Sequence, residues 1–241
     1  MTMKVLQNKL QISEARQQMN SMGISHIDPP SSRLQSLMKR LGLANGVKMG
    51  DVVKSWDVLT TINFLKSYVK KNEPILDIGC YASEVIAALH KLGFSNLTGA
   101  DLNPDLHKMP YQNLIRYETT NFMSTKFEDA SFQAITSISV IEHGFDGQAL
   151  LQEMSRLLKP GGYFIASFDY WPEKIDTVGT KFFEMEWTIF SKQEVVNFIG
   201  QAAGYGLMPV GECHYEGRDT PIECGGKKYT FGWLVLQKNG V

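Results

Sequence analysis

The sequence predicts an α/β fold with a doubly wound, seven-stranded sheet that is mostly parallel, with a C-terminal antiparallel hairpin strand and additional N-terminal helices. Two observations carry this prediction. From residue 73 onward, short apolar runs alternate with amphipathic segments, and strand–helix–strand alternation produces a parallel sheet covered on both faces. Near the end of the chain, two apolar runs follow one another without a helix between them, which predicts an antiparallel pair.

The first 72 residues carry three helical patterns, which we expect to form a helical extension or lid before a single domain over residues 73–241. Residues 3–20 are rich in Gln, Lys and Leu, and residues 32–42 follow a Pro-Pro pair and a Ser cap. Residues 51–71 place apolar side chains at helical spacing and end in two lysines, which suits a helix C-terminus.

The domain that follows contains five runs typical of buried strands, at residues 74–78, 97–101, 113–118, 132–139 and 163–169. Amphipathic segments with glycine stops or Ser caps predict helices at residues 82–93, 147–159 and 191–204. Two final strands, joined by a Gly-rich polar loop, are expected at residues 208–216 and 228–238.

Composition and charge narrow the possible functions. The 241 residues include 24 basic and 25 acidic side chains, a net charge of -1. Nucleic-acid binders usually carry a basic stripe, so we expect no nucleic-acid partner. No apolar run reaches the roughly 20 residues that span a bilayer, and three cysteines without CxxC spacing indicate free thiols in a reducing compartment. We therefore expect a soluble, cytoplasmic protein without a membrane partner, with a homodimer as one alternative for its oligomeric state.

The stretch LDIGCYASE, residues 76–84, begins like a nucleotide-cofactor loop. In an open parallel α/β sheet, ligands bind beyond the carboxyl ends of the strands. Gly79 lets a ligand approach the backbone, where a Cβ would intrude. Asp101, at the tip of the next strand, is placed to accept hydrogen bonds from ribose hydroxyls. That argument serves NAD as well as other adenosine cofactors, although the GxGxxG of a dinucleotide fold is missing.

The runs ILDIGC, GADLNP, FEDASFQAI, VIEH and RLLKPGG occur in this order. Together they resemble the class I S-adenosylmethionine-dependent methyltransferases, and most closely the small-molecule group with ubiquinone-type and sugar-type enzymes, over roughly residues 73–238. The resemblance implies S-adenosylmethionine as cofactor. It also implies methyl transfer by direct displacement to an oxygen or nitrogen of a small polar metabolite.

The resemblance also implies roles for individual residues around the cofactor. The methionine part would lie beside Asp77, Gly79, Cys80 and Tyr81, the ribose hydroxyls on Asp101, the adenine between Leu102, Asn121 and Phe122, and the sulfonium next to Ile138 and Ser139. Asn121 replaces the usual aspartate but keeps an acceptor oxygen. His143 is the candidate catalytic base; alternatively, it orients a loop or packs against the cofactor.

The acceptor pocket in this group is made by the N-terminal addition and by the loops after the fourth and fifth strands. The candidate residues are Trp56, Asp169, Tyr170, Trp171, Phe183 and Trp187. Aromatic walls with a few carboxylates suit a small polar or cationic acceptor; alternatively, the aromatic residues are core. Related families with ExxEH hold a divalent metal, but Ser139 replaces the first acid. We therefore expect no metal and a structural Glu142.

Two other interpretations stay open at this stage. The same fold can act on RNA or protein. The chain can also be a non-catalytic cofactor-binding or interaction protein, because Tyr81 and Ser83 stand where many members have glycine. A GCxxS subset of this loop is familiar, however, and serine at a helix start can cap free amides, which favours a working loop.

Overall fold

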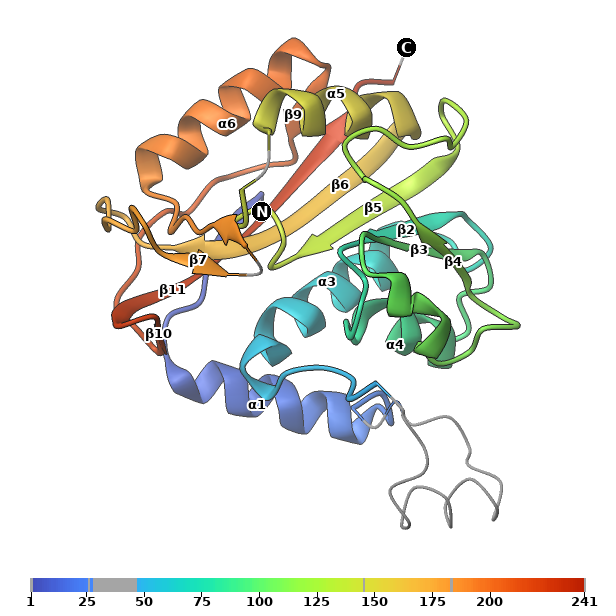
Figure 1. The fold of residues 1–241 in the computed structure, drawn as a ribbon, viewed down its shortest axis with the longest axis horizontal. Coiled ribbons are helices and arrows are strands. Elements are labelled where there is room, and N and C mark those ends of the chain that lie inside the picture. Colours follow the sequence, from blue (N-terminus) through green and yellow to red (C-terminus); the bar gives the residue numbers. More distant parts are fainter. Residues whose placement is uncertain (1, 26, 28–46, 145, 183, 241) are drawn as a thin grey trace.

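A computed structural model of the chain describes residues 2–25, 27, 47–144, 146–182 and 184–240. Within these residues a nine-stranded sheet forms the centre of the molecule (Figure 1). Its main order is β1 (Met3–Val5), β11 (Lys227–Lys238), β6 (Leu158–Tyr170), β5 (Phe132–Ile138), β2 (Ile75–Ile78), β3 (Leu97–Asp101) and β4 (Arg116–Thr119). Two further strands, β9 (Leu207–Pro209) and β10 (Ile222–Cys224), pair with β11.

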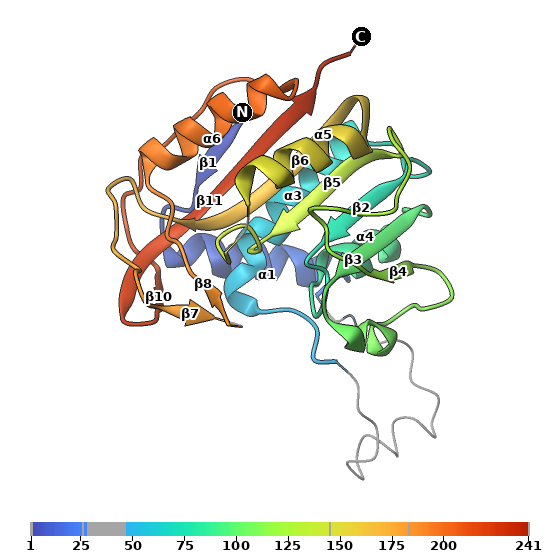
Figure 2. The same cartoon turned by 45° about the horizontal axis from the view of Figure 1, so that its top comes forward.

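Helices cover both faces of this sheet. One face carries α1 (Lys9–Ser21), α3 (Ser55–Tyr68) and α4 (Val85–Lys91), and the other carries α5 (Gly147–Leu157) and α6 (Lys192–Gly204) (Figure 2). Short elements complete the chain: η1 (Val52–Lys54), η2 (Pro104–Lys108), β7 (Lys181–Phe182) and β8 (Met185–Glu186). Strands β4, β3, β2, β5 and β6 are parallel to their neighbours, whereas β11 is antiparallel to β6. The predicted fold class is confirmed.

The number of strands is nine rather than the predicted seven, and the first extra strand lies where a helix was expected. The helix predicted over residues 3–20 begins at Lys9, where the Asn8 side chain caps it by accepting a hydrogen bond from the Gln11 amide. Before it, Met3 and Val5 are buried on the same side, and Met3 pairs with Leu234 of β11. This alternation is that of a strand.

The C-terminal hairpin also differs in detail from the prediction. Its turn is made by β10 and β11 through Gly225 and Gly226, which both have positive φ. The predicted strand over residues 208–216 is shorter, and its counterpart β9 pairs with the far end of β11. Glycine at both turn positions allows the left-handed backbone that a two-residue hairpin turn needs. The predicted helix over residues 32–42 lies outside the described residues.

The side-chain alternation of β6 separates two sets of residues that matter for the site. Phe168 and Tyr170 point into the core beneath α5 and α6. Ser167 and Asp169, between and beside them in the strand, face the side covered by α3, where Ser167 bonds to Asp57 of that helix. This period of two brings polar side chains of the sheet and of α3 together.

Candidate active site

The loop after β2 has the backbone that its sequence predicts. Gly79 has φ +66°, and a Cβ there would lie 2.3 Å from the Val140 side chain, so no other residue fits without a shift. The Ser83 hydroxyl accepts a hydrogen bond from the Val85 amide at 3.2 Å, at the start of α4. Ser83 therefore satisfies one free amide at the start of α4, although the N-cap position itself is Glu84 and has no side-chain cap. Ala82 also has positive φ, at 61°, a strained conformation of the kind often found at functional sites.

Asp77 and Cys80 lie buried beneath this loop. Asp77 Oδ1 accepts a 2.6 Å hydrogen bond from Thr136, whereas Asp77 Oδ2 has no hydrogen-bond donor among the described residues. Burial raises the pKa of Asp77 to about 7, although the hydroxyls of Thr136 and Ser83 lower it. Burial also raises the pKa of the Cys80 thiol, so Cys80 lines the site as a neutral group.

Asp101 ends β3 with its carboxylate fixed by two backbone amides. The Tyr81 amide donates to Oδ2 and the Asn103 amide to Oδ1, each at 2.9 Å. Each carboxylate oxygen keeps a further lone pair. Asp101 is therefore an oriented acceptor of two more hydrogen bonds, which is the requirement for a pair of vicinal hydroxyls.

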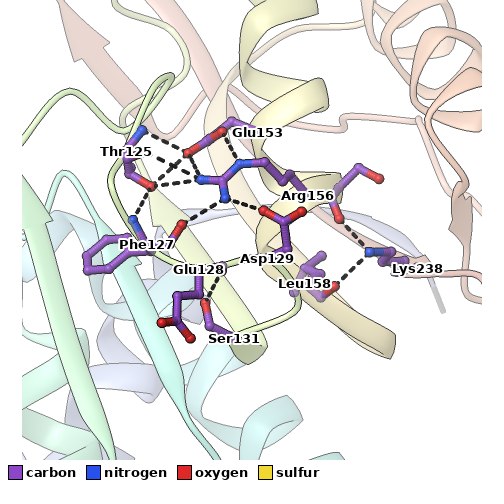
Figure 3. A network of polar contacts seen from close by, with 10 residues as sticks. Thr125, Phe127, Glu128, Asp129, Ser131, Glu153, Arg156, Leu158 and Lys238 are labelled. Atoms are coloured by element: carbon purple, nitrogen blue, oxygen red, sulfur yellow. Dashed lines mark hydrogen bonds and ion pairs between the residues drawn. The ribbon is translucent and has the colours of Figure 1, made fainter.

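The residues predicted to surround an adenine lie on the next two segments. Leu102 follows Asp101 and is 56% exposed. Asn121 Oδ1 accepts a hydrogen bond from the Met123 amide, so Asn121 shapes a local turn, and Phe122 packs against the core. The continuation of this segment is held by Arg156 of α5, which bonds Glu153, Asp129, the Phe127 carbonyl and Thr125 (Figure 3).

Ile138 and Ser139 stand at the carboxyl end of β5, next to the loop of Gly79. Ser139 has φ +55°, and its amide donates to the Ser167 carbonyl at 3.0 Å. The Val140 side chain reaches the Gly79 backbone. The ends of β2 and β5 thus meet at one edge of the sheet, as the parallel topology requires.

Four ionisable side chains gather beyond this edge, and we call them the acidic cluster: Lys54, Asp57, Glu142 and Asp169. Asp57, Glu142 and Asp169 are 0%, 1% and 4% exposed. Lys54 Nζ lies 3.7 Å from Asp169 Oδ1. Ser167 donates to Asp57 Oδ2 at 2.9 Å. The charges of Asp57 and Asp169 act on Glu142 and on Lys54, so the four groups form one unit.

Burial dominates the protonation of the cluster. It raises the pKa of Asp57 to about 6 against the lowering effect of Lys54 and Ser167. It also raises the pKa of Glu142, and the neighbouring Asp169 charge adds to this. For Lys54, burial alone would lower the pKa, but the surrounding carboxylates outweigh it and the net shift is upward. Lys54 is therefore an ammonium at neutral pH.

Aromatic side chains surround Asp169. The indole N–H of Trp187 donates to Asp169 Oδ2 at 2.7 Å, and burial together with the Asp169 charge raises the pKa of the Tyr229 hydroxyl. Trp187 and Tyr229 belong to an apolar cluster with Phe231, against which Trp56 and Trp171 pack. Of the predicted acceptor residues, the structure therefore brings Trp56, Asp169, Trp171 and Trp187 together.

Two predicted acceptor residues are not in this group. Tyr170 is fully buried on the opposite face of the sheet, where its hydroxyl donates to the Tyr215 carbonyl at 2.7 Å. Its neighbour Asp169 faces the cluster because adjacent strand residues alternate. Phe183 lies outside the described residues.

His143 lies on the loop after β5 and forms a β-bridge with Trp187. Burial lowers the pKa of His143, while the Asp169 charge opposes this. A lowered pKa keeps the imidazole neutral at neutral pH, the form that can accept a proton. Within the described part of the chain, no group of three or more His, Cys, Asp or Glu side chains is arranged to hold a metal ion.

Sequence reasoning missed Lys54 and Asp57 and gave Glu142 a structural role. Asp57 stands among apolar residues that define the buried side of α3; an acid on such a side is the signal that could have found it. Lys54 precedes the helix, and no sequence motif or periodicity around it indicates a functional role. The Glu142 carbonyl accepts a 2.8 Å hydrogen bond from the Thr188 amide, a pairing of distant segments that the sequence does not reveal.

The N-terminal segment is tied directly to the cofactor loop. Arg16 of α1 donates two 2.9 Å hydrogen bonds to the buried Glu84 carboxylate, and a third to Ser55 of α3. The Gly50 amide donates to the Ala82 carbonyl at 2.8 Å. Residues far apart in the sequence therefore hold the outer side of the loop.

Two surface cavities accompany this arrangement. One of about 680 Å³ lies between α1, η1 and the β10–β11 hairpin, with Val53 and Ile222 in its lining. None of the four residues of the acidic cluster lines this cavity. The other, of about 710 Å³, is lined by Pro74, Leu97 and Phe132 at the opposite ends of the strands, away from the edge where such sheets bind ligands.

Comparison with known proteins agrees with this architecture. Residues 76–166 match the family model described as a methyltransferase domain. The ubiquinone biosynthesis O-methyltransferase of Xanthomonas oryzae pv. oryzae is 30% identical over 100 residues, which is 39% of this chain and 41% of that protein. The chain thus matches about two fifths of the length of this curated relative.

Solved structures share the fold over most of the chain. Geranyl diphosphate C-methyltransferase from Streptomyces coelicolor A3(2), in complex with Mg²⁺, geranyl diphosphate and S-adenosyl-L-homocysteine, superposes with a TM-score of 0.56 at 16% identity, over 95% of this chain and 97% of that one. The cyclase SpnF gives 0.59 at 13% identity, over 100% and 99%. Residues 76–166 thus match a methyltransferase domain, and the chain as a whole shares the fold of these solved structures. The described residues contain no helix with the length and apolarity to cross a membrane.

Proposed function

We propose that the chain is an S-adenosylmethionine-dependent methyltransferase that methylates an oxygen or nitrogen of a small polar molecule. The observation that carries this proposal is that the expected cofactor site and the acidic cluster lie at the ends of neighbouring strands. The oriented Asp101 carboxylate and the Gly79 backbone lie at the ends of β3 and β2, and the acidic cluster lies beyond the neighbouring β5 and β6. A fold shared with the cyclase SpnF does not fix the reaction, so the site residues must support it.

The residues present fit the cofactor. Asp101 would accept hydrogen bonds from the two ribose hydroxyls, since its orientation is already set by the amides of Tyr81 and Asn103. The Asp77 Oδ2 atom, which lacks a donor in the described structure, would receive the amino group of the methionine part. Leu102 and Phe122 would flank the adenine. When bound, S-adenosylmethionine supplies a methyl group already activated on a sulfonium.

The chain's own residues would contribute position and proton transfer. Ser139 and Ile138 would lie beside the methyl group, and the acidic cluster with Trp187 would hold the acceptor. Much of the rate of a displacement on an activated donor comes from alignment. For a hydroxyl acceptor, the neutral His143 is the proposed base.

Calorimetric titration with S-adenosylmethionine and S-adenosylhomocysteine tests this proposal. We expect micromolar binding of both to the wild type and a loss of roughly 100-fold or more in Asp101→Ala, because each hydrogen bond to a charged group contributes about 1.5–3 kcal/mol. Asp105→Ala is the matched control, since this nearby carboxylate pairs with Lys108 at the surface. Binding of neither ligand to the wild type would overturn the proposal and leave the non-catalytic interpretation.

A further inference from the structure

We propose that the methyl acceptor is an amine that enters as an ammonium ion and binds against the carboxylates of Asp57, Glu142 and Asp169. This inference rests on the proposed function and gives its substrate class. It concerns the acidic cluster, which lies on the face of the sheet covered by α3.

When all three carboxyl groups of the cluster are ionised, they outnumber the one cation that meets them among the described residues, Lys54. In the unliganded protein, burial relieves this excess by raising the pKa of Asp57 and of Glu142. A buried charge without a partner is strongly unfavourable, and proteins pair such charges or leave the group neutral. One further cation would bring the cluster closer to neutrality, whereas an anionic acceptor would add to its excess.

The hydrogen bonds of the cluster are also incomplete. Asp57 Oδ1 and Glu142 Oε2 have no hydrogen-bond donor in the part of the chain that the structure describes. Asp169 Oδ1 meets only the Lys54 ammonium, at 3.7 Å, which is too long for a hydrogen bond. Buried acceptor oxygens are nearly always satisfied. A primary ammonium carries three N–H donors, and the cluster offers three acceptor oxygens that lack one.

The surrounding rings favour an organic cation. Lys54 Nζ already lies 3.8 Å from the centroid of the Phe231 ring, so this wall accommodates a cation on an aromatic face. The Trp187 indole donates to Asp169, and Tyr229 belongs to the same apolar cluster as Trp187.

The acidic cluster lies in a suitable position relative to the expected cofactor site for methyl transfer. Ser139, expected beside the sulfonium, donates its amide to the Ser167 carbonyl, and the Ser167 hydroxyl donates to Asp57. The cluster is thus joined to the end of β5 through one residue. An ammonium bound to Asp57 would lie on the side of β6 that α3 covers.

The chemistry requires the bound ammonium to lose one proton, because a protonated nitrogen has no lone pair. The proton passes first to a carboxylate of the cluster and then to water. Asp57, with a pKa of about 6, and Glu142, with a raised pKa, are the carboxyl groups that can take it. The nitrogen lone pair forms the new N–C bond while the C–S bond of the sulfonium breaks and its electron pair stays on sulfur. The product is the methylated ammonium with neutral S-adenosylhomocysteine.

Matched probes test the proposal. The wild-type protein, with and without saturating S-adenosylhomocysteine, is titrated with benzylamine and benzyl alcohol, and with ethanolamine and ethylene glycol, at neutral pH. We expect the better amine to bind at least about tenfold more tightly than its alcohol, a ratio that corresponds to about 1.4 kcal/mol. Affinity for the amine should rise with pH through the Asp57 pKa of about 6, as Asp57 ionises among Lys54, Glu142, Asp169, His143 and Tyr229.

Two variants locate the effect. Glu142→Gln and Asp57→Asn should reduce the amine preference to less than about threefold while S-adenosylhomocysteine affinity stays within about twofold. Glu128→Gln, an exposed carboxyl group remote from the cluster, should leave the preference unchanged. Equal or tighter binding of the alcohols to wild type, or no binding of either amine, overturns the amine proposal. If the wild type does not bind S-adenosylhomocysteine, the proposed function is overturned instead. The titrations with amines and alcohols in the absence of S-adenosylhomocysteine then still decide whether the protein prefers the amine.

Discussion

Arg16→Ala is expected to destabilise the fold far more than an ordinary surface mutation. Arg16 bonds both oxygens of Glu84, whose side chain is only 3% exposed, and also bonds Ser55. Removing one partner of such a pair leaves an uncompensated buried charge, at a cost of about 3–5 kcal/mol. For a chain of this size each kcal/mol corresponds to about 2–4 °C, so we expect a fall in Tm of roughly 6–20 °C.

A double-mutant cycle isolates this pair. Free energies of unfolding are measured by urea denaturation followed by circular dichroism for wild type, Arg16→Ala, Glu84→Gln and the double variant. Because Glu84→Gln removes the charge that Arg16→Ala strands, the double variant should be more stable than the sum of the single effects by at least about 2 kcal/mol. The matched control is Arg116→Ala, which breaks the exposed pair with Glu118 and should cost at most about 1 kcal/mol.

The same cycle has a functional readout. Glu84 immediately precedes α4, and Gly50 packs closely on the Glu84 side chain while its amide bonds the Ala82 carbonyl. We therefore expect Arg16→Ala to weaken S-adenosylhomocysteine binding as well. A destabilisation no larger than that of Arg116→Ala, or strictly additive effects, would refute the reasoning that Arg16 holds the loop.

Three further outcomes are expected. Gly79 has φ +66° and lies against Val140, so Gly79→Ala should lower the free energy of unfolding by at least about 1 kcal/mol and weaken cofactor binding. The control Gly200→Ala in α6 should raise the free energy of unfolding by about 0.5–1 kcal/mol. Equal effects of the two variants in urea denaturation would contradict this prediction. Asp77→Asn should flatten the pH dependence of the free energy of unfolding. The Asp77 pKa is raised from 3.8 to about 7 in the folded state, so the stability that Asp77 contributes is present below about pH 4 and is lost as the pH rises to about 7. An unchanged pH profile in the variant would count against this prediction. Arg156→Ala should speed amide exchange in residues 121–131 and cost about 1.5–3 kcal/mol, because the network of Figure 3 is lost; unaltered exchange there would show that the segment is held otherwise.

The sheet and its helices could be predicted because their signals are local. The strand over residues 97–101 and the helix start at Ser191, with its reciprocal Glu194 bond, lie where the sequence predicts them. The strand β1 could not be predicted, because three residues are too few to show the alternation of a strand. In addition, Leu234, the partner of Met3, lies more than two hundred residues away in the sequence. The positions of Gly79, Asp101 and Asp169 at strand ends were predictable for the same local reason.

The acidic cluster required the tertiary structure. The partner of Asp57 is Ser167, separated by 110 residues, and the Lys54 ammonium meets Asp169 only after α3 has packed on β6. Sequence periodicity records that a helix position faces the core, but not which strand residue it meets there. The charge imbalance that supports the amine proposal is therefore a property of the assembled fold.

The raised pKa values of this edge argue for a ligand rather than for stability. Asp57 and Asp77, with pKa values of about 6 and about 7, and Glu142, with a raised pKa, all stabilise the folded state when protonated and lose that contribution as the pH rises. Near neutral pH these carboxyl groups therefore work against folding. Perturbed ionisable groups gather at functional sites, where a bound molecule can compensate them. Because Asp77 faces the expected cofactor and Asp57 the expected acceptor, binding of each should restore stability most strongly at the pH where the unliganded protein loses it.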